Sequence, residues 1–262
     1  MKKQMMTTAA ATLLVLTAVS GTAAYAVEGD GYTTNGAVEF TPSTDPTSPV
    51  NPDNPDPNVP IEPFDPTDPD GPRPGTDGPL SIDYASSLDF GLNKISNKDE
   101  IYFARAQSYK TEDTPSTANY VQISDNRGSN AGWVLKVKQN SQFTSTTETL
   151  NDTLIGAEIT FDEPYVASNS SATEPIATKP VKLTPDGAEC TLVTAIATSG
   201  AGTWITKWGS VETIQEKDED GNDVETEVTK DIHLSVPGST PKDAVKYTTT
   251  LTWNLSDVPT NE

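Results

Sequence analysis

The 262-residue sequence contains one cysteine and one histidine, and this scarcity limits the chemistry that it can support. Cys190 alone cannot form an intramolecular disulfide, and it is not placed to be the acylated first residue of a lipoprotein. Because no basic residue adjoins it to lower the pKa of its thiol, we interpret it as a strand or core residue. His233 lies between Ile232 and Leu234 in a strand-like stretch, which favours a half-exposed strand position over a catalytic base.

Long apolar runs are scarce as well. The one near the N-terminus, residues 9–19, follows Lys2 and Lys3 and precedes Ala24-Tyr25-Ala26. It is too short to span a bilayer, and its flanks are typical of a secretory signal peptide, so we predict cleavage after residue 26. No second run is long enough to cross a membrane, and the C-terminus has no sorting motif or hydrophobic tail. We therefore expect a secreted, extracellular protein. If it is attached to a surface, the attachment must be non-covalent.

Positive charge is the third scarcity. The chain has 17 basic and 38 acidic residues, and loss of Lys2 and Lys3 with the signal peptide leaves 15 against 38, a net charge of −23. Such a charge repels nucleic acid and anionic membranes, so we expect neither as a partner. It also repels other anionic polymers, so binding to an anionic surface must come from short-range contacts. The same charge favours solubility.

No motif indicates a catalytic, metal or cofactor site. The acidic stretch 218–223 resembles a calcium loop only superficially, because its glycine is fourth rather than sixth and Thr229 occupies the twelfth position. A solvated hairpin tip explains it better. Acids are plentiful, so their number leaves a glycoside-hydrolase pair open, but none lies in a recognised motif. We expect no catalytic residue, no metal and no cofactor.

Proline and acid are concentrated in residues 42–79, which hold 13 of the 21 prolines, eight acids and a single base, Arg73. Proline lacks the N–H that a strand ladder needs, so we predict an extended, mobile loop that buries little apolar surface. A spacer is favoured over a docking motif. The preceding Ala37–Thr41 alternates like a strand, and we expect it to pair back into the main sheet. Residues 27–262 would then form one domain that contains the loop.

From residue 80 onward, apolar residues recur with period two, and Gly, Asn, Asp and Pro separate the runs. Residues 132–137 and 157–161 alternate strictly. Residues 211–217 and 224–229 flank Asp220-Gly221, which favours a hairpin with a type I′ turn. No apolar stripe of helical period appears. We predict an all-β chain that folds as a Greek-key or immunoglobulin-like β-sandwich over residues of about 30–260.

Two of these strands carry the same local pattern. Trp133-Val-Leu135 lies in a central strand, and Trp253-Asn-Leu255 lies in the C-terminal one. In a strand, residues two apart point to the same face, so each Trp and Leu share a face. In the second strand Leu251 extends that apolar face, while Thr252 and Asn254 point the other way. Each strand therefore has one apolar and one polar side, as a two-sheet sandwich requires.

In this pair of motifs the sequence resembles the WxL surface proteins of low-GC Gram-positive bacteria. The resemblance covers essentially the whole mature chain and includes further segments: Gly36–Pro42, Pro79–Tyr84, Leu88–Gly91, Val121–Gly128, Leu154–Ile159, Gly202–Trp204 and Tyr247–Pro259. Trp208 is one departure, because a different aromatic is expected there. The resemblance implies an exported, non-enzymatic protein associated with peptidoglycan in the outer wall. It also implies assembly with companion surface proteins, some of them membrane-anchored.

The role of the aromatic residues stays open between two alternatives. Trp133, Leu135, Trp253 and Leu255 are favoured as sandwich core over a glycan-stacking platform. If a wall or partner surface uses aromatics, Trp204 and Trp208 are the candidate exposed ones, because they follow the glycine-rich residues 200–202. The rival functions are a protein–protein assembly module, anchored through its partner, and a secreted glycan hydrolase.

Overall fold

The computed structural model describes residues 31–257, with the exception of 112 and 219. The predicted signal peptide lies outside this range. The described residues form sixteen strands, and they include no helix long and apolar enough to cross a membrane. The strands are β1 (Leu80–Ala85), β2 (Glu100–Arg105), β3 (Tyr120–Asp125), β4 (Trp133–Gln139), β5 (Phe143–Ser145), β6 (Thr153–Leu154), β7 (Glu158–Phe161), β8 (Pro164–Ala167), β9 (Ile176–Ala177), β10 (Val181–Leu183), β11 (Cys190–Ala195), β12 (Gly202–Trp208), β13 (Val211–Lys217), β14 (Asp223–Val236), β15 (Tyr247–Thr248) and β16 (Leu251–Ser256).

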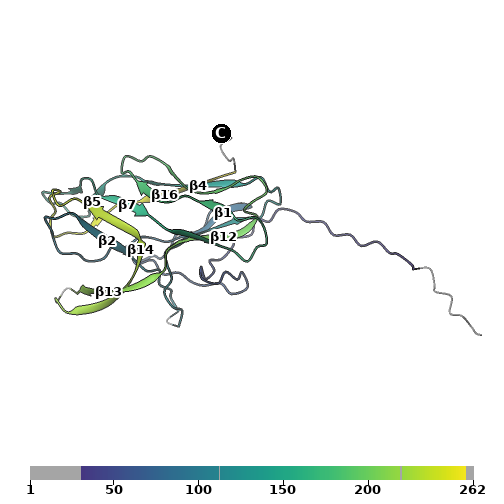
Figure 1. The fold of residues 1–262 in the computed structure, drawn as a ribbon, viewed down its shortest axis with the longest axis horizontal. Helices are drawn as coiled ribbons and strands as arrows, with labels where there is room; N and C mark the ends of the chain where they lie inside the picture. Colours follow the sequence, from purple (N-terminus) through teal and green to yellow (C-terminus); the bar gives the residue numbers. More distant parts are fainter. Residues whose placement is uncertain (1–30, 112, 219, 258–262) are drawn as a thin grey trace, which may run out of the picture. The chain divides into compact units, whose positions relative to one another are not determined.

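Two four-stranded sheets, in the orders β1-β3-β12-β8 and β16-β4-β11-β9, face each other across the core (Figure 1). A five-stranded sheet contains β10-β7-β14-β13, with β2 also paired to β14, and a small sheet contains β15-β5-β6. The ladders between these strands are antiparallel. Neighbours in a sheet are mostly not consecutive in sequence, so the chain crosses between sheets as a Greek-key topology requires. The predicted all-β sandwich is confirmed.

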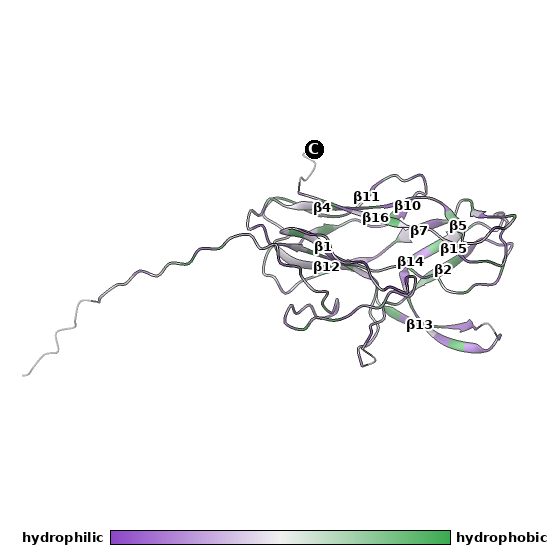
Figure 2. Cartoon of the chain, turned by 180° about the vertical axis from the view of Figure 1, so that it is seen from behind, coloured by the Kyte–Doolittle hydropathy of each residue, from purple (hydrophilic) through white to green (hydrophobic). Residues whose placement is uncertain are grey.

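The period-two pattern explains which side chains enter the core. In β4 the inward residues Trp133, Leu135 and Val137 are at most 1% exposed, whereas Lys136 and Lys138 alternate with them on the outer face. Figure 2 shows the same mixture of apolar and polar residues along the strands. Burial of one such face is the main favourable term for a sandwich of this kind.

Residues 42–79, here called the proline strap, differ from the sequence prediction. Val50 is only 1% exposed and packs with Tyr84, Tyr120 and Ile205 in a second apolar cluster. The side chain of Gln122, which is fully buried, accepts a hydrogen bond from the Val50 N–H (2.9 Å) and donates one to the Ser48 carbonyl (3.0 Å). The expectation that this stretch buries little apolar surface is therefore wrong at Val50, whereas Val59 and Phe64 of the same stretch are 61% and 47% exposed.

The second half of the proline strap is held in the same way. Gln107 donates from its side-chain amide to the Phe64 carbonyl (2.8 Å), and the Phe64 N–H donates to the Ser108 carbonyl (2.9 Å). Ser87 donates to the Asp65 carboxylate (2.6 Å). Glutamine side chains and loop carbonyls thus replace the ladder partners that proline cannot have. The strap covers the outer face of β3, whose six residues are all buried.

The segment before the strap forms no strand. Residues 37–41 are extended and exposed, with Val38 at 78% and Phe40 at 87% exposure. The prediction that Ala37–Thr41 pairs into the main sheet is therefore wrong for this structure. Among the described residues, 40–257 form one compact unit by their mutual contacts. The residues up to Glu39 are not part of that unit.

The predicted hairpin is present, with a longer turn than expected. β13 pairs with the first half of β14 from Val211↔Thr229 to Lys217↔Asp223, so five residues rather than two connect the strands. Asp218 closes this turn, because its carboxylate accepts the Asn222 N–H (2.7 Å). The second half of β14 pairs with β2 and β7 and belongs to the core.

Candidate functional site

The first Trp-x-Leu motif is core. Trp133 and Leu135 lie inward on β4 with 1% and 0% exposure. The indole N–H of Trp133 donates to the Gly200 carbonyl (3.0 Å), which satisfies its one polar group. Gly200 has φ +74°, and a Cβ there would lie 2.5 Å from the Ala195 Cβ. Glycine therefore lets this loop close onto the Trp133 ring, and no surface of the motif is left for a ligand.

The second motif lies directly beside the first but at the edge of the sheet. Trp253 pairs with Val137, and Leu255 pairs with Leu135, so β16 and β4 bring the two leucines opposite each other. Trp253 and Leu255 pack against the core but are only partly buried. The Trp253 ring centroid is 6.2 Å from that of Phe161. Because β16 has a strand on one side only within the described part of the chain, this motif is half covered.

Trp204 and Trp208 are not exposed, so their prediction as surface aromatics is wrong. They are 5% and 2% exposed, and both belong to the core cluster. The Trp204 indole N–H donates to the Ala201 carbonyl (3.0 Å), and the Trp208 ring lies 4.8 Å from Phe161. The reason is that β12 is an inner strand between β3 and β8, and its even-numbered residues face inward.

His233 and Cys190 lie in strands, and neither is arranged for catalysis. His233 is on β14, between partners on β2 and β7, and is half-buried. The Cys190 thiol is free, and its pKa is raised by burial and by the charge of Asp186, which keeps it protonated and unreactive. Among the described residues, no group of three His, Cys, Asp or Glu side chains could hold a metal ion.

A groove opens where two edge strands separate. β7 pairs with β10 from Ile159↔Leu183 to Phe161↔Val181, but β8 then pairs with β12 and β9 pairs with β11. Glu163, at φ +37°, and Lys179 form an ion pair of 2.7 Å where the chains diverge. Beyond that bridge, β8 and β9 belong to different sheets. The groove is therefore produced by topology, with one ion pair at its closed end.

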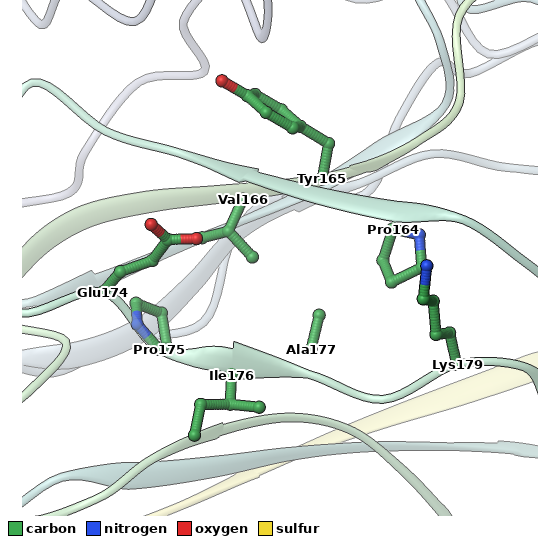
Figure 3. A pocket seen from close by; sticks show the side chains of 8 residues that line it. All are labelled: Pro164, Tyr165, Val166, Glu174, Pro175, Ile176, Ala177 and Lys179. Atoms are coloured by element: carbon green, nitrogen blue, oxygen red, sulfur yellow. The ribbon is translucent and has the colours of Figure 1, made fainter.

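The first hollow of the groove measures about 390 Å³. Pro164, Val166 and Ala177 point into it, and Glu174 and Lys179 stand at opposite ends (Figure 3). Proline lacks an N–H, so Pro164 and Pro175 reduce the ability of this edge to recruit another strand. The hollow is thus an apolar trough with an acid at one end and a base at the other. Its lining residues are Pro164, Tyr165, Val166, Glu174, Pro175, Ile176, Ala177 and Lys179.

A second hollow of about 490 Å³ shares Tyr165, Val166 and Glu174 with the first. The proline strap forms one wall with residues 53–55, and Ser168, Ser170 and Ser171 form another. Tyr165 is 60% exposed, and its ring points away from the first hollow (Figure 3). Lys207 lies 5.5 Å from the centroid of this ring and also pairs with Asp53. We call the two hollows together the β8–β9 groove.

No short motif in the sequence predicts the β8–β9 groove. The local signal for it is weak: a tyrosine between proline and valine, then, after Ala167, four residues of which three are serine. The feature that creates the groove is the divergence of β8 from β9, and that depends on pairing with β12 and β11. Such long-range pairing is not encoded in any short motif.

Comparison with known proteins supplies one match. The family model described as WxL domain surface cell wall-binding matches residues 27–259. No curated protein and no solved structure matches the chain. The matched range includes both Trp-x-Leu strands and the β8–β9 groove.

Proposed function

The chain belongs to the WxL family of surface proteins that bind the cell wall, and we propose that it binds peptidoglycan non-covalently and without catalysis through the β8–β9 groove. As a member of that family it is a cell-wall-associated surface protein. The matched range begins at residue 27, directly after the predicted signal-peptide cleavage point, and this supports export of the mature chain.

The observation that carries this proposal is the combination of groups in the groove. Tyr165 offers an exposed ring, Glu174 a carboxylate and Ser171 an exposed hydroxyl group. The hydroxyls of Ser168 and Ser170 donate to the Thr203 and Ala201 carbonyls and so shape this wall rather than contact a sugar. A sugar ring binds by stacking its apolar face on an aromatic ring while polar groups contact its hydroxyls. The apolar trough beyond Tyr165 suits the methyl of an N-acetyl group. Volumes of about 390 and 490 Å³ fall in the ordinary range for a small-ligand site.

The Trp-x-Leu residues act as structural residues in this proposal. Trp133 and Leu135 are buried, and they hold two sheets together rather than touch the wall. Binding that depends on short-range groove contacts also meets the constraint from charge, because a strongly acidic chain gains no attraction from an anionic wall.

The positions of the carboxyl groups support binding rather than hydrolysis. A glycosidase needs an acid whose pKa is raised, close to a second carboxylate across the substrate. Burial raises the pKa of Asp83 and of Asp231. Neither lines the groove: Asp83 accepts hydrogen bonds from Ser81 and Ser124 on the strap-covered face, and Asp231 lies on β14.

The companion-protein function remains the second candidate, and a separate observation favours it. β16 is an edge strand with half-covered apolar side chains, which is a surface that a partner protein could use. In that case a partner, rather than the groove, would supply the attachment to the wall.

The test is capture of the pure mature chain by peptidoglycan stripped of protein. We expect capture, and about tenfold weaker capture, roughly 1.4 kcal/mol, for Tyr165→Ala. Tyr32→Ala is the matched control, because Tyr32 is 94% exposed and does not line the groove. No capture of the wild-type chain would favour the assembly module, and release of soluble wall fragments would favour the hydrolase.

A further inference from the structure

The outer edge of β16 carries backbone groups without a strand partner among the described residues. β16 pairs only with β4, from Leu251↔Gln139 to Ser256↔Val134. Just before β16, the Asn140 N–H donates to the Thr250 carbonyl (3.0 Å), so even-numbered residues direct their backbone groups toward β4. The N–H and C=O groups of Leu251, Trp253 and Leu255 therefore point to the open side.

The side chains at this edge are also incompletely covered. Leu251, Trp253 and Leu255 pack against the core, yet each remains partly exposed. Their partners one strand inward, Leu135 and Val137, are fully buried. This difference in burial between β16 and β4 is expected when a sheet could accept one more strand at its edge. A strand added to β16 would cover these three side chains and bond their backbone groups at the same time.

Residues 37–41 have the pattern that such a strand needs. Val38 and Phe40 are two residues apart and so share one face of an extended chain, with Glu39 on the other face. Their exposures of 78% and 87% leave these apolar side chains in water. Five residues in strand conformation span about 17 Å, which matches the length of β16.

We propose that residues 37–41 of one copy of this chain add as a strand to the free edge of β16 in a second copy. Val38 and Phe40 then lie against Trp253 and its neighbours in the core. Glu39 lies on the outer face, and β16 lies between it and Lys136 and Lys138 of β4. Lys138 makes no ion pair with any described residue, so it offers a free positive charge to Glu39. This assembly goes beyond wall binding, and it uses the edge of the sheet opposite to β9 and the groove.

The favoured partner is a second copy because the chain itself carries the complementary strand. Donation from each copy to the next gives a head-to-tail contact, which closes only if two copies exchange strands reciprocally. The mature chain should therefore form dimers or short chains whose population rises with concentration.

A disulfide trap tests the contact directly. One mature protein carries Glu39→Cys and a second carries Asn254→Cys, each with Cys190→Ser, so that every molecule has one thiol. Both positions lie on the outer face of the added strand pair. We expect a mixed disulfide dimer on oxidation. Thr194→Cys in place of Asn254→Cys is the control, since it lies on β11, two strands from the edge, and should not trap.

Sedimentation velocity is the second experiment, and it measures self-association of the variants. Val38→Asp with Phe40→Asp should weaken association at least tenfold, while Ala37→Asp with Thr41→Asp adds the same charge on the opposite face and should change it little. Tyr165→Ala should associate as the wild type does, which separates this contact from wall binding. A wild-type chain that stays monomeric and gives no mixed disulfide would overturn the proposal. So would a disulfide that forms only within one molecule carrying both Glu39→Cys and Asn254→Cys.

Discussion

The two Trp-x-Leu motifs have the same local sequence pattern but different surroundings. Trp133 is on β4, which has a strand on each side, and it is 1% exposed with its indole N–H bonded to Gly200. Trp253 is on the edge strand β16 and is only partly buried. The comparison teaches that period two decides which face of a strand is apolar, whereas the number of neighbouring strands decides how completely that face is covered.

The largest expected effect follows from removal of the inner ring. Trp133→Ala should lower the free energy of unfolding by roughly 3–5 kcal/mol, because it leaves a cavity and removes a buried hydrogen bond. Guanidinium unfolding of the mature chain measures this. Since a domain has only about 5–15 kcal/mol in total, partial unfolding at room temperature would also agree. A loss below about 1 kcal/mol would contradict the core assignment of Trp133.

Gly200→Ala should give the next largest effect. The added Cβ would lie 2.5 Å from the Ala195 Cβ and 2.7 Å from the Trp133 indole nitrogen, at φ +74°. We expect a loss of roughly 2–4 kcal/mol from overpacking and backbone strain. Gly221→Ala is the control, because it has φ +86° but nothing within 4 Å. Equal losses for both variants in a thermal unfolding comparison would mean that contact with Trp133 adds nothing.

Trp253→Ala should cost less than either, roughly 1–2 kcal/mol, because part of the ring is already in water. The chain should stay folded, so that its wall binding can still be interpreted. Leu251→Ala, on the same edge, serves as a smaller reference. The Trp253→Ala value is for the dilute, monomeric chain in a thermal unfolding comparison, and the cost should rise with protein concentration if a strand adds to β16. A cost equal to that of Trp133→Ala in the dilute chain would contradict the edge position of Trp253.

Much of this comparison was predictable from sequence, because period two identifies inward residues such as Trp133 and Leu135 without any knowledge of partners. Trp204 and Trp208 were assigned wrongly because glycine-rich residues 200–202 suggested an exposed loop. In the structure Gly200 serves the opposite purpose, since its missing Cβ allows Trp133 to approach. A glycine permits close contact as readily as it permits exposure.

The proline strap and the β8–β9 groove were not predictable for a different reason. Burial of Val50 depends on Gln122, which is 72 positions away in sequence. The groove depends on β8 pairing with β12 while β9 pairs with β11. Proline content shows that the strap cannot form a ladder, but it does not indicate that glutamine side chains take the place of one.

Salt should have the smallest effect and should not distinguish the two motifs. The predicted mature chain carries a net charge of −23, which repels an anionic wall, and added salt screens this repulsion. Capture by peptidoglycan should therefore rise by about two- to threefold between low and physiological salt. Wild type and Trp253→Ala should change by the same factor. A fall with salt would indicate that ion pairs, rather than groove contacts, dominate recognition.

The central claim is that the groove contacts the wall while the Trp-x-Leu motifs hold the fold together. Its most direct test is capture of folded Tyr165→Ala and folded Trp253→Ala by protein-free peptidoglycan in one experiment, with thermal unfolding of each. We predict a near-wild-type melting temperature and about tenfold weaker capture for Tyr165→Ala. Trp253→Ala should melt lower but be captured as the wild type is. A fully stable Trp253→Ala protein that no longer binds, beside a Tyr165→Ala protein that does, would contradict the account.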